Sequence, residues 1–164
     1  MISRRGSLAL VGAAVLAACA KKAPTPMAPD AAKAFLATNA KAPGVTVTRS
    51  GLQYKILRSG PATGLRPKPA DEIKVNYEGK LVTGEVFDSS YERGAPAVMT
   101  LSGLVPGWVE VLQLMRPGDE WMVWLPPDLG YGDKSAGPIP PGSVLVFKLE
   151  LIDVLPDQSS VGRG

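Results

Sequence analysis

The sequence predicts an α+β domain, in which antiparallel strands pack against one helix. Residues 52–56, 73–77 and 147–151 alternate apolar and polar side chains, which is the two-residue period of a half-buried strand. Residues 121–125 indicate a further strand that is apolar on both faces. Between these strands, the apolar residues of 107–115 recur at helical spacing, and the Pro-Gly pair that follows ends the predicted helix.

The composition fits one domain with a short extension. The chain has 164 residues, of which 45% are hydrophobic, so it can fill one core, and its 18 glycines and 16 prolines indicate many turns. It contains no histidine, which excludes a histidine-based catalytic triad, imidazole metal ligands and an imidazole general base. We therefore expect no metal and no cofactor, and any chemistry has to use carboxylates, hydroxyls, the backbone or packing.

The first residues resemble an export signal that ends at the single cysteine. Arg4 and Arg5 precede an apolar run over 8–18, which is too short to span a membrane as a helix, and Cys19 follows. The Leu-Ala-Ala before Cys19 resembles the bacterial lipobox, so we expect removal of a signal peptide, 1–18, and acylation of Cys19; an incidental or buried cysteine is the alternative. The two arginines match the twin-arginine export signal weakly, so the export route stays open.

The processed chain is predicted to carry little net charge. Loss of residues 1–18 removes two arginines and no acidic residue, which lowers the formal net charge from +3 to +1. A nearly neutral chain without a block of basic residues has no electrostatic footprint for phosphates, so we expect no nucleic-acid partner.

The remaining chain divides into a tether, a main domain and a tail. Residues 19–44 are predicted to hold the acylated cysteine, a proline-rich tether and a short helix over 31–40, with Asp30 as a candidate N-cap. Residues 45–156 contain the predicted strands and form the main domain. The polar residues 157–164 are expected to be a flexible tail.

Six short segments of the main domain carry the functional signal in their joint order and spacing. They are Val75-Asn76-Tyr77-Glu78-Gly79, Gly84-Glu85-Val86-Phe87-Asp88-Ser89-Ser90, Arg93 with Pro96, Val105-Pro106-Gly107-Trp108-Val109-Glu110, Tyr131-Gly132, and Ile139-Pro140-Pro141 before Leu145-Val146-Phe147. Over roughly residues 50–155 the chain resembles the FKBP family of peptidyl-prolyl cis-trans isomerases. The resemblance implies a five- to six-stranded antiparallel sheet wrapped around one short helix, with an apolar pocket between them.

Carried over by position, the resemblance also implies the residues of the pocket. Those assigned to catalysis are Tyr77, Phe87, Asp88, Trp108 as the floor, Tyr131, Ile139 and Phe147, and those assigned to substrate binding are Arg93, Met99, Leu104 and Val105. The Tyr131 hydroxyl and the Ile139 N–H would bind carbonyls of the bound peptide, and Arg93 would hold Asp88. Taken singly, aromatic residues are more often part of a core, and Met99 stands where many family members have phenylalanine.

The implied activity needs no nucleophile or base. Rotation about a peptide bond has a barrier of about 18 to 20 kcal/mol because it breaks amide resonance, and the two isomers of an X-Pro bond are nearly equal in energy. An apolar aromatic pocket accepts the less polar, twisted amide more readily than the planar one. The resemblance therefore predicts a prolyl isomerase for exported proteins; the alternative is a non-catalytic module or chaperone that binds prolyl segments.

The expected partners follow from the resemblance and from the export signal. We expect proline-containing unfolded or exported polypeptides as substrates, with macrolides as further ligands of the pocket. Acylation would hold the chain on a membrane of the bacterial envelope, facing the periplasm, and Ala20 after Cys19 favours the outer membrane. Secreted relatives that dimerise carry a long helical N-terminal region, whereas only residues 30–41 have helical character here, so we expect a monomer.

Overall fold

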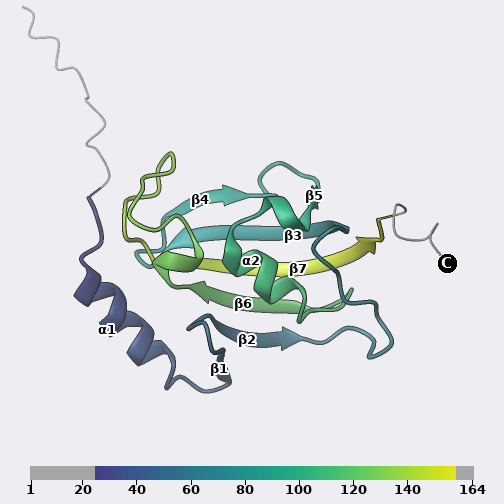
Figure 1. Cartoon of the computed structure of the whole chain (residues 1–164), viewed down its shortest axis with the longest axis horizontal. Coiled ribbons are helices and arrows are strands. Elements are labelled where there is room, and N and C mark those ends of the chain that lie inside the picture. Colours follow the sequence, from purple (N-terminus) through teal and green to yellow (C-terminus); the bar gives the residue numbers. More distant parts are fainter. Residues whose placement is uncertain (1–24, 158–164) are drawn as a thin grey trace, which may run out of the picture.

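The strands predicted from alternation form the middle of one antiparallel sheet (Figure 1). The structure is a computed structural model that describes residues 25–157. The sheet order is β1-β2-β6-β7-β3-β4, and β5 also pairs with β3. The strands are β1 (Val45–Val47), β2 (Gln53–Arg58), β3 (Glu72–Leu81), β4 (Val86–Ser89), β5 (Ala97–Thr100), β6 (Glu120–Leu125) and β7 (Leu145–Leu155). The helices are α1 (Pro29–Asn39) and α2 (Pro106–Leu112), with single 3-10 turns at Leu101–Gly103 and Pro127–Leu129.

Side-chain alternation determines which face of the sheet forms the core. In β3, Ile73, Val75 and Tyr77 are buried, whereas the residues between them are partly exposed. Phe147 and Leu149 of β7 are buried on the same face. β3 pairs with β7 along its full length of 10 residues, so the two longest strands share one continuous apolar surface.

α2 covers this apolar surface and makes the core two layers thick. Trp108, Val111 and Leu112 face inward and are buried. Gly107 allows the helix to approach β6 closely, since a Cβ atom at this position would lie 2.4 Å from Leu125 Cδ2. The helix is shorter than the 107–115 predicted from the sequence, because the chain turns after residue 112 toward the Pro-Gly pair that precedes β6.

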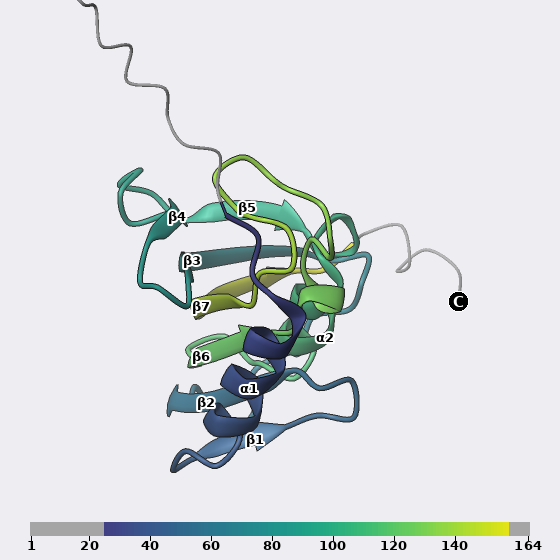
Figure 2. The same cartoon turned by 90° about the vertical axis from the view of Figure 1, so that its left-hand side faces the viewer.

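α1 runs across one end of the sheet, beside β1 and β2 (Figure 2). The prediction that Asp30 caps this helix is wrong, because the helix begins at Pro29 and Asp30 lies in its first turn. The N-cap residue is Ala28, which has no side-chain cap, and the fixed φ of a proline suits the first helical position. The helix is held to β2 by the Asn39 amide, which donates to Gln53 Oε1 at 2.8 Å.

The α+β class and the wrapped antiparallel sheet are confirmed, and the sheet has seven strands. The sequence did not indicate β1, β4 and β5, which have only three or four residues each; β1 and β5 contain no buried residue, and β4 contains one, Ser89. Three or four residues contain at most two repeats of the apolar-polar alternation, which is too few to distinguish a strand from a loop. Within residues 25–157, neither helix is long and apolar enough to cross a membrane.

Candidate active site

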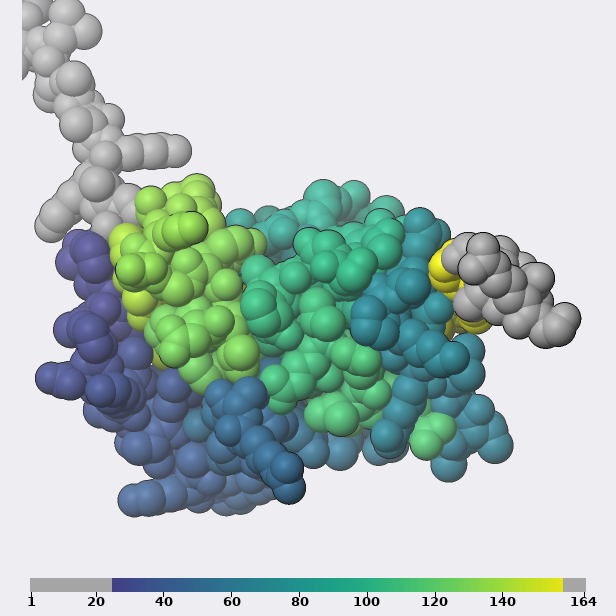
Figure 3. Space-filling view, in the orientation of Figure 1, coloured from purple at the N-terminus to yellow at the C-terminus, as the bar shows by residue number. Residues whose placement is uncertain are grey.

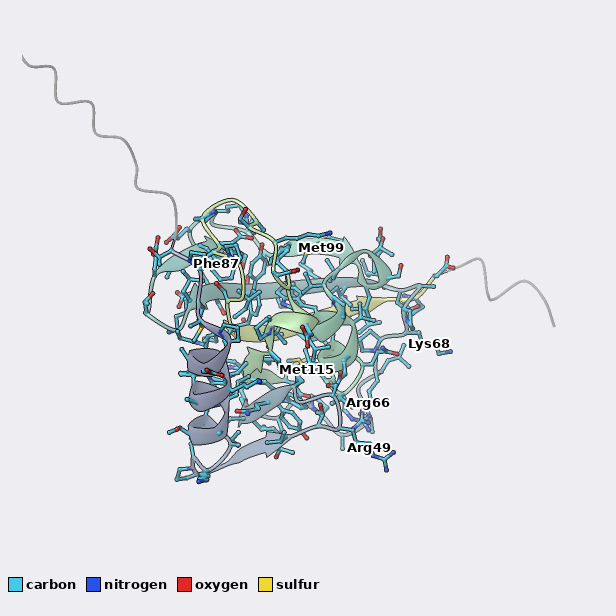
Figure 4. The ribbon with its side chains drawn as sticks, turned by 60° about the vertical axis from the view of Figure 1, so that its left-hand side comes forward. Arg49, Arg66, Lys68, Phe87, Met99 and Met115 are labelled. Atoms are coloured by element: carbon cyan, nitrogen blue, oxygen red, sulfur yellow. The ribbon has the colours of Figure 1, made fainter. Side chains whose placement is uncertain are left out.

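A cavity of about 280 Å³ lies between α2, strands β3, β4, β5 and β7, and the loop that follows β6. Every predicted wall residue except Ile139 lines this cavity. Phe87 and Met99 reach it from β4 and β5, which pair with the two ends of β3 along the edge away from β7 (Figure 4). The complete lining is Tyr77, Phe87, Asp88, Met99, Gly103, Leu104, Val105, Trp108, Tyr131 and Phe147.

The aromatic rings meet edge to face around Trp108. The Trp108 ring lies 5.1 Å from the Tyr77 ring and 5.2 Å from the Phe147 ring, with interplanar angles of 84° in both pairs. Phe87 meets Phe147 at 5.6 Å and 88°. Edge-to-face pairs place the positive rim of one ring on the negative face of the next, which fixes the rings in place. The result is a rigid apolar enclosure with one indole at its base.

Gly79 makes this ring arrangement possible, although sequence reasoning did not single it out as a site residue. It lies on β3 opposite Phe147 of β7, and a Cβ atom there would be 2.6 Å from Phe147 and 2.7 Å from Phe87. Only a residue without a side chain lets both rings cross the strand at this point. A glycine inside an otherwise alternating strand was the available signal.

Tyr77, Asp88 and Arg93 form a closed hydrogen-bonded triangle at the rim of the cavity. The Tyr77 hydroxyl donates to Asp88 Oδ2 at 2.5 Å, and Arg93 donates to the other carboxylate oxygen, Oδ1. The second guanidinium nitrogen of Arg93 donates to the Tyr77 hydroxyl at 2.7 Å. Arg93 does not line the cavity itself, so it acts by holding Asp88 and Tyr77 in position.

The triangle keeps the Asp88 carboxyl ionised at neutral pH. Burial raises the pKa of Asp88, but the hydrogen bonds from Tyr77 and Arg93 and the charge of Arg93 outweigh it, so the net pKa lies below the ordinary value. Burial raises the pKa of the Tyr77 hydroxyl, and the hydrogen bond to Asp88 raises it further, so the hydroxyl remains a proton donor. Both groups therefore hold one protonation state at neutral pH.

Ile139 does not occupy the place that the sequence assigned to it. Its side chain is buried in the core, and its N–H donates to the Ala136 carbonyl at 3.0 Å in an isolated bridge. The expected role of this N–H as a donor to a bound peptide is therefore corrected, because the donor is already used. Sequence position alone does not reveal this tight turn within the 134–140 loop.

Two other donors face no acceptor within the described chain. Val105 lines the cavity and is the N-cap residue of α2, so its N–H lies outside the helical hydrogen bonds, and no acceptor within residues 25–157 takes it. The Tyr131 hydroxyl also lacks a partner in this range, and its side chain is 43% exposed. Both donors belong to residues that line the aromatic cavity, and two donors suit two carbonyls of an extended peptide.

The fold and the cavity together define an α+β domain with a small, mainly apolar cavity between a sheet and one helix. Residues 64–152 match the family model described as FKBP-type peptidyl-prolyl cis-trans isomerase. Residues 13–56 match the model described as the domain amino terminal to FKBP-type peptidyl-prolyl isomerase. The chain belongs to the FKBP-type peptidyl-prolyl cis-trans isomerase family.

Known proteins resemble the chain over its main domain. It is 47% identical over 126 residues to the peptidyl-prolyl cis-trans isomerase Mip of Coxiella burnetii, a match that covers 76% of this chain and 54% of that protein. It is 46% identical over 122 residues to the FKBP-type 22 kDa peptidyl-prolyl cis-trans isomerase of Escherichia coli, covering 74% and 58%. The chain thus spans about half the length of the curated relatives it matches.

Solved structures agree with this assignment. The crystal structure of FkpA from Escherichia coli matches with a TM-score of 0.73 and 41% identity, covering 76% of this chain and 58% of that one. A peptidyl-prolyl cis-trans isomerase from Pseudomonas syringae matches with a TM-score of 0.72 and 34% identity, covering 80% of this chain and 99% of that one. The arrangement of the sheet around α2 is therefore that of the family.

Proposed function

We propose that this chain is a peptidyl-prolyl cis-trans isomerase that accelerates rotation about X-Pro bonds in polypeptides. The observation that carries the proposal is the cavity: the edge-to-face rings of Trp108, Tyr77, Phe147 and Phe87 line a volume of about 280 Å³, and the donors of Val105 and Tyr131 beside it have no acceptor within residues 25–157. A pyrrolidine ring is a flat apolar group that fits against an indole. The names of the relatives point to the same activity.

The mechanism requires the cavity to favour the twisted amide over the planar one. The planar amide is strongly polar because of resonance, and rotation reduces that polarity, so transfer into an apolar enclosure disfavours the ground state more than the transition state. The Tyr131 hydroxyl and the Val105 N–H would each hold a carbonyl on either side of the rotating bond. With the proline ring held against Trp108, one end of the amide turns while the other stays fixed.

Met99, Leu104 and Val105 would contact the residue that precedes proline. All three line the cavity, and Met99 lies on β5, which is separated from Phe147 on β7 by β3. Asp88 and Tyr77 form the polar rim, and Arg93 acts as a positioning residue for both. Ile139 supports the loop from within the core. Macrolides that present an apolar ring and two carbonyls would compete for the same donors.

We further propose that the chain works in the bacterial envelope as a lipid-anchored monomer. The supporting observations are the lipobox-like sequence before Cys19 and a relative from Legionella longbeachae that is named outer membrane protein MIP. Cys19 lies outside the described residues, as do the signal peptide 1–18 and the tail beyond residue 157. Light scattering tests the monomer, and palmitate labelling of wild type against Cys19→Ser tests acylation.

A protease-free isomerisation assay on a short X-Pro peptide tests the proposed activity. We expect acceleration by the wild-type chain, a lower rate for Tyr131→Phe, which removes only the hydroxyl, and inhibition by a macrolide. Circular dichroism of each variant controls for folding. A folded chain that binds the peptide but does not accelerate rotation would replace this proposal with a non-catalytic prolyl-binding module.

A further inference from the structure

A second cavity, of about 370 Å³, lies on the α2 side of the sheet. It is lined in part by Trp121 of β6 and Ile56 of β2, which face each other across the two strands. Trp121 and Val123 share one face of β6, and Val123 pairs with Phe147, which lines the aromatic cavity, so both cavities open on the same face. The volume lies in the range of ligand pockets, about 300 to 1,000 Å³.

The two cavities lie at opposite ends of α2. Trp108 in the first turn of the helix lines the aromatic cavity, and Leu114, two residues beyond the helix, lines the second one. In the space-filling view α2 occupies the middle of this face, with the loop that follows β6 on one side and the loop that follows β2 on the other (Figure 3). A helix of 7 residues such as α2 is about 10 Å long. Three or four residues of an extended peptide span this length.

Part of the lining of the second cavity is apolar and aromatic. The Tyr54 ring stacks on the Trp121 ring at 4.5 Å with an interplanar angle of 17°. Ile56 remains 49% exposed beside this pair. The Trp121 indole nitrogen is buried and has no hydrogen-bond partner within residues 25–157, a property it shares with Trp108 of the aromatic cavity. An exposed apolar residue next to stacked rings offers surface that a ligand side chain would cover.

The charged residues of this cavity differ in how far their side chains are already paired. Arg66 is exposed and has no hydrogen bond or ion pair within the described chain; Figure 4 shows it projecting from the loop that follows β2. Asp119, the acid in the lining, accepts the Gly60 N–H at 2.6 Å and the Arg116 N–H at 2.8 Å, so both its oxygens are used by the backbone. Arg116 donates to the Gly64 carbonyl at 2.6 Å.

We propose that the second cavity binds a polypeptide segment in which an apolar side chain lies next to a carboxylate. The stacked rings and Ile56 would cover the apolar side chain, and the guanidinium of Arg66 would pair with the carboxylate, for which its planar donors are suited. A polypeptide fits better than a membrane surface, because the lining holds two arginines against one acid and is concave and aromatic rather than a broad basic face.

The position of the cavity also favours a polypeptide. If the chain has the proposed function, a bound polypeptide whose proline occupies the aromatic cavity would continue over α2. A residue a few positions from that proline would then reach Arg66. The binding of the acidic segment itself does not depend on isomerisation, so it can be measured with peptides that contain no proline.

The test compares two fluorescein-labelled, proline-free peptides on the full chain carrying Cys19→Ser: one of alternating leucine and glutamate, and one with glutamine in place of every glutamate. We expect the glutamate peptide to bind about 3- to 10-fold more tightly at low ionic strength, with the difference reduced by added salt. Arg66→Glu should remove this preference. Arg49→Glu is the matched control, because Arg49 is also exposed and lies outside the cavity lining, and its substitution changes the net charge by the same amount.

A second pair of variants tests the apolar walls. Ile56→Ser should weaken binding of both peptides, whereas Val98→Ser, at a residue 53% exposed on β5, should leave it unchanged. Equal affinity for the two peptides, or equal effects of Arg66→Glu and Arg49→Glu, would overturn the proposal. Arg66-dependent binding to phosphatidylglycerol vesicles without an effect on peptide binding would overturn it in favour of a membrane surface.

The isomerase assay separates this proposal from the proposed function. Arg66→Glu should leave the isomerisation rate of a short X-Pro peptide at the wild-type value, because such a peptide does not reach the second cavity. If the wild-type chain accelerates no prolyl peptide but still prefers the glutamate peptide through Arg66, the proposed function fails and the binding site stands.

Discussion

Replacing Gly79 with alanine tests whether the aromatic cavity depends on ring positions. The new Cβ atom would lie 2.6 Å from Phe147 Cε1 and 2.7 Å from Phe87 Cε2, whereas ordinary contacts begin at 3.4 Å. Both rings must therefore move away from the strand, Phe147 by about 0.8 Å and Phe87 by about 0.7 Å, to restore ordinary contacts. Phe87 is half-exposed and can turn outward, whereas Phe147 is buried and its movement also displaces its edge-to-face contact with Trp108.

The expected consequences differ in size for stability and activity. Overpacking of this kind costs about 1 to 3 kcal/mol, which urea unfolding measures as a lower free energy of unfolding. A displacement near 1 Å in a catalytic enclosure reduces the rate on the order of 10²-fold, so we expect Gly79→Ala to lower kcat/KM toward an X-Pro peptide by about 10- to 100-fold. The variant should remain folded at 25 °C.

Gly103→Ala is the matched control for this substitution. Gly103 also lines the cavity, but a Cβ atom there would meet nothing within 4 Å, and its backbone has no left-handed φ. The free energy of unfolding should stay the same or rise by about 0.4 to 1 kcal/mol, since alanine restricts the unfolded chain. If Gly79→Ala matches the wild type in both stability and kcat/KM, the argument from ring positions is wrong.

Three further outcomes test the polar groups and the wall of the cavity. Val105→Pro removes one N–H at a backbone φ of −58°, which proline adopts, so the fold should persist while kcat/KM falls by about 10-fold; an unchanged kcat/KM would exclude this N–H as a substrate donor. Because the folded-state pKa of Asp88 lies below its ordinary 3.8, the carboxylate stabilises the fold above that pH and loses this effect as the pH falls through the folded value. Asp88→Asn should therefore be less stable than wild type at pH 7, by under about 1 kcal/mol because the Asp88 side chain is 44% exposed. In urea unfolding below pH 3.8 the free energies of unfolding of the variant and the wild type should converge. A difference that stays constant with pH would contradict this. Met99→Phe should change the rate or the preference for the residue before proline, and identical profiles in a prolyl-peptide panel would count against a role for this side chain.

The long elements could be predicted from the sequence because their patterns repeat. β3 and β7 alternate over many residues, and the buried positions of β3 at Ile73, Val75 and Tyr77 are those that the pattern indicated. β1 has three residues, too few for a period to be recognised. The prediction of an Asp30 cap failed because the helix begins at Pro29, two residues earlier than expected, and a proline is itself a signal for the first helical position.

The site illustrates a sharper limit on prediction from sequence. Side chains of the cavity could be assigned position by position from the resemblance to the family, and those on β3, β4, β5, β7 and α2 lie on the face that lines the cavity. A backbone donor is different, since its availability depends on which carbonyl folds back onto it. The Ile139 N–H is taken by Ala136 three residues earlier, whereas the Val105 N–H is free because a helix begins at the next residue.

The positions of these two donors change how the proposed reaction is understood. A donor on Ile139 would belong to the exposed loop that follows β6, whereas Val105 adjoins the first turn of α2, beside Trp108. The proline ring and one flanking carbonyl would then be held by the same rigid element, and Tyr131 on the loop would hold the other. Substitutions that loosen the loop that follows β6 should therefore raise KM, because they weaken the contact from Tyr131. The proline ring and the carbonyl held by α2 should keep their geometry, so steady-state kinetics can separate the contributions of the loop and of α2.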